Sequence, residues 1–107
     1  MFVFSLLLME PLHFEEILGL LDGLVGWEEF NQEFICKTFH FPDFVEALDF
    51  VNKIGVVAEA QRHHPKIVLS YGKVVVELST HDVQGLSLKD FELARLIDEL
   101  FDESKSS

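Results

Sequence analysis

The spacing of hydrophobic positions changes several times along the chain, and each change marks a new structural element. After Pro11, a residue favoured at the first position of a helix, a leucine-rich segment with helical spacing runs to Gly23 and Gly26. From Trp27 to Phe41 the spacing becomes two, with aromatic and β-branched residues, and the turn-like pair Asn31-Gln32 divides the run. The first part of the chain therefore predicts a helix followed by a β-hairpin.

A second helix is predicted directly after this hairpin. Asp43 can accept the free amide hydrogens of a first helical turn, and Glu46 stands at the three-residue spacing of a capping box. Apolar residues keep helical spacing to about Glu59. The helix must end near His64, because a residue before a proline is disfavoured in helical conformation, and Pro65 follows.

The last third of the chain predicts a second hairpin and a third helix. The valine-rich run from Ile67 to Thr80 has strand character and is interrupted by a turn at Gly72-Lys73. Ser87 and Asp90 have capping-box spacing and mark the start of the last helix. Residues Glu103 to Ser107 are polar and are expected to form a frayed tail.

The element order α-β-β-α-β-β-α indicates an α+β fold. Two hairpins with helices between and around them favour a four-stranded, mainly antiparallel sheet with three helices packed on one face. The 107 residues suit one domain, residues 1–107, in which residues 1–10 are an N-terminal extension and residues 103–107 a frayed tail.

Composition narrows the environment and the partners. Eight basic residues against nineteen acidic ones give a formal charge of −11, which repels phosphate backbones and anionic lipid, so we expect neither nucleic acid nor a membrane as a direct partner. A single cysteine, Cys36, cannot form an intramolecular disulfide, and a reducing cytoplasm is the simplest compartment.

The apolar opening run from Met1 to Leu8 raises the question of a targeting segment. It has no basic residue before Lys37, no small-residue cleavage site, and is much shorter than the about 20 apolar residues that cross a bilayer. We interpret it as an extension or an upstream start, with Met9 as an alternative initiator.

Three of the five histidines lie at predicted junctions, where functional side chains are held by rigid elements yet reach solvent. His63 and His64 follow the second helix, and His81 follows the last strand. Imidazole gains and loses a proton near neutral pH, so histidines that share one pocket can act as general acid and base.

These residues belong to a longer ordered pattern, which reads Glu59-x3-His63-His64-Pro65-x5-Tyr71-x9-His81-x8-Asp90. It resembles the signature of the pterin-4a-carbinolamine dehydratases in residue types and spacing. Further segments look like that family in the same order, and coverage runs from about Leu12 to Leu100; among them are Phe39 to Phe44, Leu78 to His81 and Gly85 to Ser87. A bare His-His-Pro would be weak, whereas the ordered set is specific.

The resemblance implies an enzyme that dehydrates 4a-hydroxytetrahydropterin to quinonoid dihydropterin during tetrahydrobiopterin recycling, in functional partnership with an aromatic amino-acid hydroxylase. It implies a pterin substrate, no metal or organic cofactor, and a homo-oligomer, either a dimer or a tetramer built from dimers. Self-association through apolar helix faces and a sheet edge is expected.

Carried over residue by residue, the resemblance makes His63, His64 and His81 the catalytic histidines. His63 and His81 are expected to be the acid–base pair, with either one as the first donor, and His64 orients the pterin. Glu59 would hold an imidazole in one tautomer. The other residues expected to bind the pterin are Pro65, Thr80, Asp82 and Val83. The residues expected to support the site are Tyr71 and Asp90. Asp90 could instead be only a capping residue.

Two alternatives stay beside the dehydratase. A zinc site from Glu59 and the three histidines is disfavoured, because neighbouring residues such as His63 and His64 point in different directions. An interaction role is the second, because vertebrate relatives also act as dimerisation cofactors of a homeodomain transcription factor. The sequence departs from the family at Lys66, where an acidic residue is common, and at Val83-Gln84, where small residues are usual.

Overall fold

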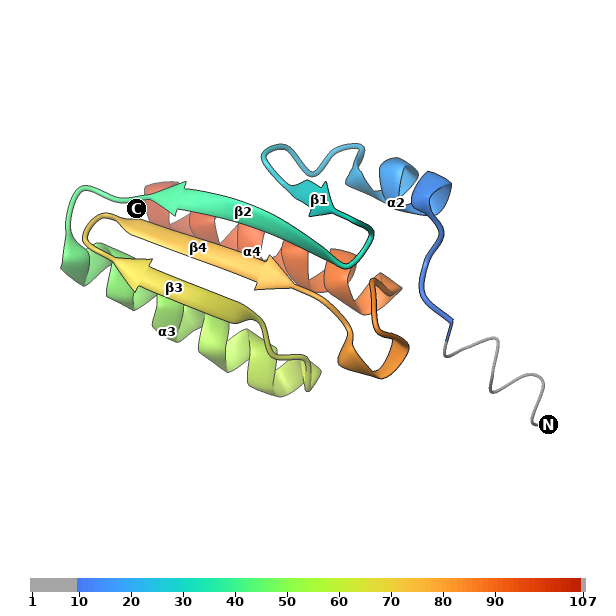
Figure 1. Cartoon of the computed structure of the whole chain (residues 1–107). Helices are drawn as coiled ribbons and strands as arrows, with labels where there is room; N and C mark the ends of the chain where they lie inside the picture. The colour runs from blue at the N-terminus through green and yellow to red at the C-terminus, as the bar shows by residue number, and fades with distance from the viewer. Residues whose placement is uncertain (1–9, 107) are drawn as a thin grey trace.

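A four-stranded antiparallel sheet carries the two long helices on one face (Figure 1). The computed structural model describes residues 10–106. Its elements, in chain order, are α2 (Phe14–Leu21), β1 (Glu28–Phe30), β2 (Phe34–His40), α3 (Phe44–Gln61), β3 (Lys66–Ser70), β4 (Lys73–Leu78), the 3-10 helix η1 (His81–Val83) and α4 (Leu88–Ser106). The predicted α+β class and the α-β-β-α-β-β-α order are confirmed.

The sheet order is β1-β2-β4-β3, and every neighbouring pair is antiparallel. In the β3–β4 hairpin, Lys66 pairs with Glu77, so the start of β3 lies beside the end of β4. The two histidines before β3 and the histidine after β4 are therefore carried to the same end of the sheet. This hairpin register is the structural origin of the candidate site.

The turn of the β3–β4 hairpin differs by one residue from the sequence-based expectation. Ser70 pairs with Lys73, so Tyr71 and Gly72 form the turn and Lys73 belongs to β4. Gly72 takes the left-handed conformation with φ +68°, which a glycine adopts without steric cost. The glycine therefore occupies the second turn position, and the lysine is free to pair.

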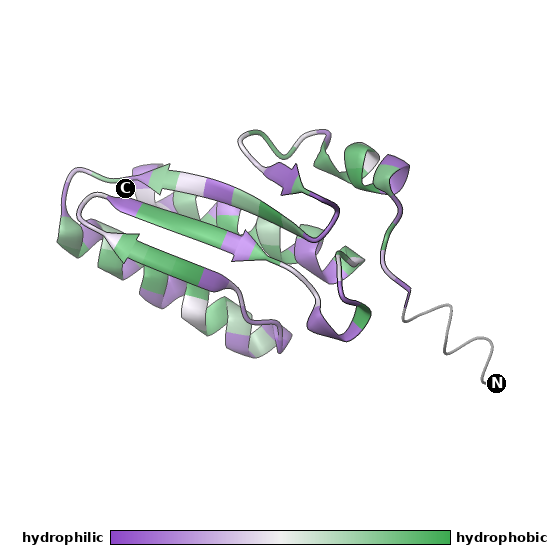
Figure 2. Ribbon diagram, in the orientation of Figure 1, coloured by the Kyte–Doolittle hydropathy of each residue, from purple (hydrophilic) through white to green (hydrophobic). Residues whose placement is uncertain are grey.

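The core lies between the sheet and the helices α3 and α4. Alternate residues of the central strands face it, and in β4 these are Val74, Val76 and Leu78, which are fully buried. Figure 2 shows that most of β4 is apolar. Phe39 of β2 packs against Phe50 of α3, with ring centroids 4.9 Å apart. Burial of each such side chain stabilises the folded state by about 1.5–3 kcal/mol. The core therefore holds rigidly the end of the sheet at which the three histidines lie.

The N-terminal segment is tied to the loop before α4. The Leu12 amide donates to the Leu86 carbonyl at 2.8 Å, and Ile17 of α2 is fully buried. Of the expected extension, all but Glu10 lies outside the described residues, as does Met9, the alternative initiator. At the other end, α4 continues to Ser106, through most of the segment expected to fray. No helix within residues 10–106 is long and apolar enough to cross a membrane.

Candidate active site

The three predicted catalytic histidines line one pocket of about 260 Å³ at the end of the sheet. This size is close to the lower end of the range for small-molecule sites, about 300 Å³. The lining comes from the end of α3, the end of β4, η1 and the start of α4: Arg62, His63, His64, Ser79, Thr80, His81, Asp82 and Lys89. Segments far apart in the sequence thus converge on a single open depression.

The end of α3 places His63 in the wall of this pocket. Arg62 ends the helix in the left-handed conformation, with φ 53°. The His63 amide then donates back to the Ala58 carbonyl at 3.1 Å, which is the bond of a Schellman motif. The chain is turned sharply at this point, and the His63 ring is directed into the protein, where only 9% of the residue is exposed.

Asp90 is the partner of His63. The His63 Nε2 lies 2.5 Å from Asp90 Oδ1, and Asp90 is completely buried. The other carboxylate oxygen, Oδ2, accepts from the Thr80 hydroxyl at 2.7 Å and from the Ser87 amide at 3.0 Å. Asp90 is therefore both the capping residue of α4 and the anchor of the histidine, which unites the two roles that the sequence left as alternatives.

This arrangement determines which nitrogen of His63 is available for chemistry. A carboxylate accepts, so Nε2 carries the hydrogen, and Nδ1 is the second ring nitrogen. Nδ1 has no hydrogen-bond partner among residues 10–106, and no buried side-chain nitrogen or oxygen of these residues is unpartnered. Nδ1 is therefore not sealed in the interior, and His63 lines the pocket.

His64 is also paired with a carboxylate, but at the surface. Its Nε2 contacts Glu59 Oε2, and the side chains are 63% and 77% exposed, respectively. The expectation that Glu59 holds an imidazole thus has a structural counterpart in this contact. Since both groups are hydrated, the pair orients His64 loosely, whereas Asp90 orients His63 tightly.

His81 sits on a short loop that is closed at both ends. Thr80 and Gly85 exchange backbone hydrogen bonds of 2.8 and 3.4 Å, and Gln84 takes the left-handed conformation between them. A Cβ on Gly85 would lie 2.9 Å from the Pro11 side chain, so only glycine fits under the N-terminal segment. The loop holds the exposed His81 at the pocket rim.

The structure brings some of the predicted residues together and leaves others apart. Thr80 and Asp82 line the pocket, whereas Pro65 and Val83 are not among its lining side chains. Tyr71 lies in the β3–β4 turn and is 75% exposed. The six residues of β4 separate it from the histidine end of the sheet, a distance of roughly 20 Å.

Three lining residues were not predicted from the sequence, and each is the chain neighbour of a predicted one. Arg62 precedes His63, Ser79 precedes Thr80, and Lys89 precedes Asp90. Their adjacency was the available signal. Only the register of the β3–β4 hairpin and the start of α4 show that these neighbours face the same depression.

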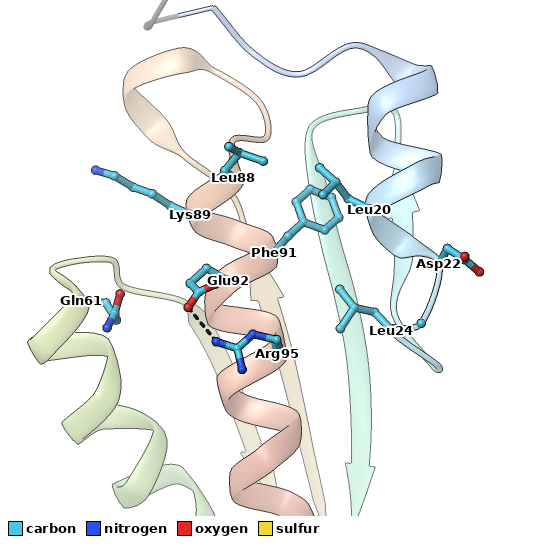
Figure 3. Close-up of a pocket in the computed structure, with 10 residues that line it drawn as sticks. Leu20, Asp22, Leu24, Gln61, Leu88, Lys89, Phe91, Glu92 and Arg95 are labelled. Atoms are coloured by element: carbon cyan, nitrogen blue, oxygen red, sulfur yellow. Dashed lines mark hydrogen bonds and ion pairs between the residues drawn. The ribbon is translucent and has the colours of Figure 1, made fainter.

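A larger cleft of about 680 Å³ lies between α2 and α4 (Figure 3). Its walls are mainly apolar, with Leu20, Leu24 and Phe91 facing one another, and no histidine lines it. Arg95 on its rim donates to Glu92, and this hydrogen bond raises the pKa of the guanidinium. No histidine lines this cleft, whereas three histidines line the smaller pocket at the end of the sheet.

The donor set of the histidine pocket does not suit a metal ion. Within residues 10–106 no three His, Cys, Asp or Glu side chains converge as metal ligands. The Nε2 atoms of His63 and His64 are turned to different carboxylates, one buried and one exposed. The arrangement supports proton transfer by imidazoles that carboxylates orient.

Comparison with known proteins places this geometry in a family. The family described as Pterin 4 alpha carbinolamine dehydratase matches residues 10–100. The chain belongs to the pterin-4a-carbinolamine dehydratase family. A provisionally named pterin-4-alpha-carbinolamine dehydratase of Picosynechococcus sp. is 47% identical over 85 residues, covering 79% of this chain and 91% of that protein.

Two further relatives are matched over nearly their full length. A provisionally named pterin-4-alpha-carbinolamine dehydratase of Sulfurisphaera tokodaii is 44% identical over 92 residues, covering 86% of this chain and 98% of the relative. A crystal structure described as a transcriptional coactivator/pterin dehydratase from Brucella melitensis superposes with a TM-score of 0.81 at 32% identity, covering 85% and 98% of the two chains. The fold of that structure is thus matched over most of this chain.

Proposed function

We propose that this protein dehydrates 4a-hydroxytetrahydropterin to quinonoid dihydropterin and water. In this reaction the C4a–O bond breaks, the hydroxyl leaves with a proton as water, and N5 loses its hydrogen as the C4a=N5 double bond forms. One proton is delivered and one is removed, so a general acid and a general base are sufficient, and the net change is the release of water.

The single observation that carries this proposal is the convergence of three histidines on one pocket, with one of them anchored by a buried carboxylate. His63 presents Nδ1 to the pocket while Nε2 is held by Asp90. A proton taken up on Nδ1 therefore creates an ion pair and no isolated buried charge. We propose His63 and His81 as the proton-transferring pair, in either order, and His64 as the residue that orients the pterin.

The polar edge of the pterin needs partners at the same pocket. The 2-amino group and N3 of a pterin are hydrogen-bond donors, and the Asp82 carboxylate on the lining can accept from them. The Thr80 hydroxyl already donates to Asp90, so it meets the substrate as an acceptor or acts through Asp90. We propose that the reaction uses no metal or organic cofactor and serves tetrahydrobiopterin recycling beside an aromatic amino-acid hydroxylase in the cytoplasm.

The test generates 4a-hydroxytetrahydropterin in situ with a phenylalanine hydroxylase and follows its decay with and without this protein. We expect decay faster than the spontaneous rate, and a loss of about 10²- to 10⁴-fold in the protein-dependent rate for the double variant His63→Ala/His81→Ala. The variant His40→Ala, which changes an exposed histidine on β2 outside the pocket, is the matched control. A folded double variant with full activity would refute the proposal.

Self-association is part of the same proposal. Helix α3 presents apolar side chains on its outer surface, with Val45 and Val56 more than 70% exposed and Leu48 40% exposed. Such a stripe favours burial against another copy. Light scattering at micromolar concentration is expected to give a dimer or tetramer, and a single 12.3 kDa species would contradict this.

An interaction role is the second candidate, and the similar Brucella structure described as a transcriptional coactivator/pterin dehydratase favours keeping it. A protein that acts only as an adaptor needs no imidazole at the pocket. If the folded wild-type protein fails to accelerate dehydration, the adaptor becomes the leading function. If His63→Ala abolishes dehydration, the enzyme assignment stands.

A further inference from the structure

Two basic side chains at the histidine pocket have no acidic partner. Of the eight Lys and Arg residues, four form ion pairs at 4.0 Å or less: Lys37, Lys53, Lys66 and Arg95. Arg62 and Lys89 form none within residues 10–106, and both line the pocket. In a chain with nineteen acidic residues, two unpaired cations at one small depression form a local exception to the charge of the surface.

The backbone presents Arg62 to the pocket in an unusual way. Its φ of 53° lies in the left-handed region, where helices more often end with glycine or asparagine because a Cβ is disfavoured there. A long cationic side chain at this position is explained if the guanidinium has a ligand. Arg62 stands directly before His63, so such a ligand would touch the site of proton transfer.

Lys89 reaches the pocket from a different element, α4. It belongs to the first turn of α4, one residue before Asp90. Figure 3 shows its side chain extending away from Leu20 and Phe91, on the side of α4 where α3 ends at Gln61. Lys89 lines the histidine pocket together with Arg62, and it also borders the larger cleft.

The remaining charges of the site are already engaged or suited to another part of the ligand. Asp90 is paired with His63, and Glu59 is paired with His64. Asp82 is the one further carboxylate on the lining, and it suits the N–H edge of the pterin. At physiological salt, charges beyond about 8 Å are largely screened, so a ligand in the pocket experiences Arg62 and Lys89 more strongly than the overall charge of −11.

We infer that the pocket recognises a pterin whose C6 side chain ends in an anionic group, either a phosphate monoester or a carboxylate, bound between Arg62 and Lys89. This inference rests on the proposed function, because it assumes that a pterin occupies the histidine pocket. An anion at this position completes the charge-assisted hydrogen bonds of the guanidinium and the ammonium. The two cations are thus specificity residues, and the histidines serve the bond-breaking step.

The experiment measures equilibrium binding of stable, fluorescent pterins to the full chain. The probes are 6-hydroxymethylpterin, its phosphate monoester and 6-carboxypterin, so that the phosphate and carboxylate arms are read separately against a neutral reference. At 50 mM salt we expect at least one anionic probe to bind about tenfold more tightly than the neutral one, with the advantage shrinking as salt is raised. The neutral probe must displace the anionic one if both use the same pocket.

The variants remove the two charges with little change to the backbone. Arg62→Asn keeps a residue that tolerates the left-handed conformation, and Lys89→Gln keeps a good helix former. The double variant is expected to bring the affinity ratio of anionic to neutral probe close to one, while the charge-preserving pair Arg62→Lys and Lys89→Arg retains the preference. Lys73→Gln is the matched control, because Lys73 forms no ion pair within residues 10–106 and lies beside the β3–β4 turn, at the far end of the sheet.

The outcomes separate this inference from the proposed function. Equal affinities of wild-type protein for all three probes, or a preference that survives in the folded double variant, would overturn the inference. Dehydratase activity without an anionic preference would overturn the inference alone. An intact, Arg62- and Lys89-dependent preference without dehydratase activity would keep the anionic pterin site and remove the proposed reaction.

Discussion

Two histidine–carboxylate pairs stand side by side in this protein and differ in almost every physical respect. His63 and Asp90 are buried, and Asp90 accepts three hydrogen bonds. His64 and Glu59 are exposed, and within residues 10–106 Glu59 has one partner, His64. The same two chemical groups thus form a rigid pair and a hydrated pair at neighbouring positions of one chain.

The difference shows which pair can set the geometry of a reaction. A carboxylate in the core is held by its partners and holds them in turn, so the His63 ring has one tautomer and one direction. An exposed pair contributes about 0–1 kcal/mol and is weakened by salt. His63 is therefore suited to proton transfer at a defined atom, and His64 to adjustable contact with a ligand.

The largest expected contrast is in stability. Asp90→Ala leaves the donors of His63, Thr80 and Ser87 without their acceptor in a buried site, and we expect a loss of about 3–5 kcal/mol in the free energy of unfolding. Glu59→Ala is expected to change it by less than about 1 kcal/mol. Urea titrations of the two variants measure the difference, and equal losses would show that the Asp90 network does not stabilise the site.

The next contrast is in rate, with milder substitutions. Asp90→Asn preserves shape but replaces one of the two acceptor oxygens by an NH2 group, so either His63 or the Thr80 hydroxyl loses its acceptor, and we expect about tenfold slower dehydration. Glu59→Gln keeps an acceptor for His64 and is expected to cost about twofold or less. Steady-state rates on the same substrate decide between them. A larger loss for Glu59→Gln would reverse the assignment of the two pairs.

The third histidine, His81, is positioned by the backbone of its loop and, within residues 10–106, not by a carboxylate. Gly85→Ala places a methyl group 2.9 Å from the Pro11 ring, and we expect about 1–3 kcal/mol of destabilisation together with a displaced His81. Gly55→Ala is the control, because nothing lies within 4 Å of its added Cβ in α3 and a helical alanine is favoured by about 0.5–1 kcal/mol. Thermal melts of both variants check this, and an unchanged Gly85→Ala melt would contradict the contact.

The smallest effect concerns carboxylates on the outer face of the sheet. Partial burial, then Glu77 and Glu28, raise the pKa of the Cys36 thiol. The folded state thus favours the neutral thiol. The neutral thiol of Cys36 contributes its full stabilisation below the pKa of the unfolded chain, and this stabilisation is lost as pH rises through the pKa of the folded chain. Alkylation by iodoacetamide at pH 8 is expected to be slower than in the urea-unfolded chain and faster in Glu77→Gln. Identical rates in wild type and Glu77→Gln would contradict the influence of Glu77.

Local rules predicted the elements because their causes lie within a few residues. Asp43 accepts the Glu46 amide at 2.8 Å, as its capping spacing indicated, and Asn31 and Gln32 adopt the left-handed turn conformations that end β1. The turn at Tyr71 and Gly72 was displaced by one residue, because strand register depends on both strands and on the glycine position together.

The site was predictable only in part for a different reason. Spacing identified the histidines, and the hairpin register then brought them together. Spacing could not show that Asp90 reaches His63 across 27 residues, or that Arg62 and Lys89 border the same pocket as His81. Such contacts depend on how α3 and α4 pack on the sheet, which no local pattern encodes.

The proposed mechanism depends on a buried, Asp90-anchored His63 that moves a proton during dehydration. The most direct test compares His63→Gln with His64→Gln in the decay of 4a-hydroxytetrahydropterin generated in situ. We expect His63→Gln to lower the protein-dependent rate constant by about 10²- to 10⁴-fold, and His64→Gln mainly to raise KM. A folded His63→Gln variant with the wild-type rate constant would contradict the claim.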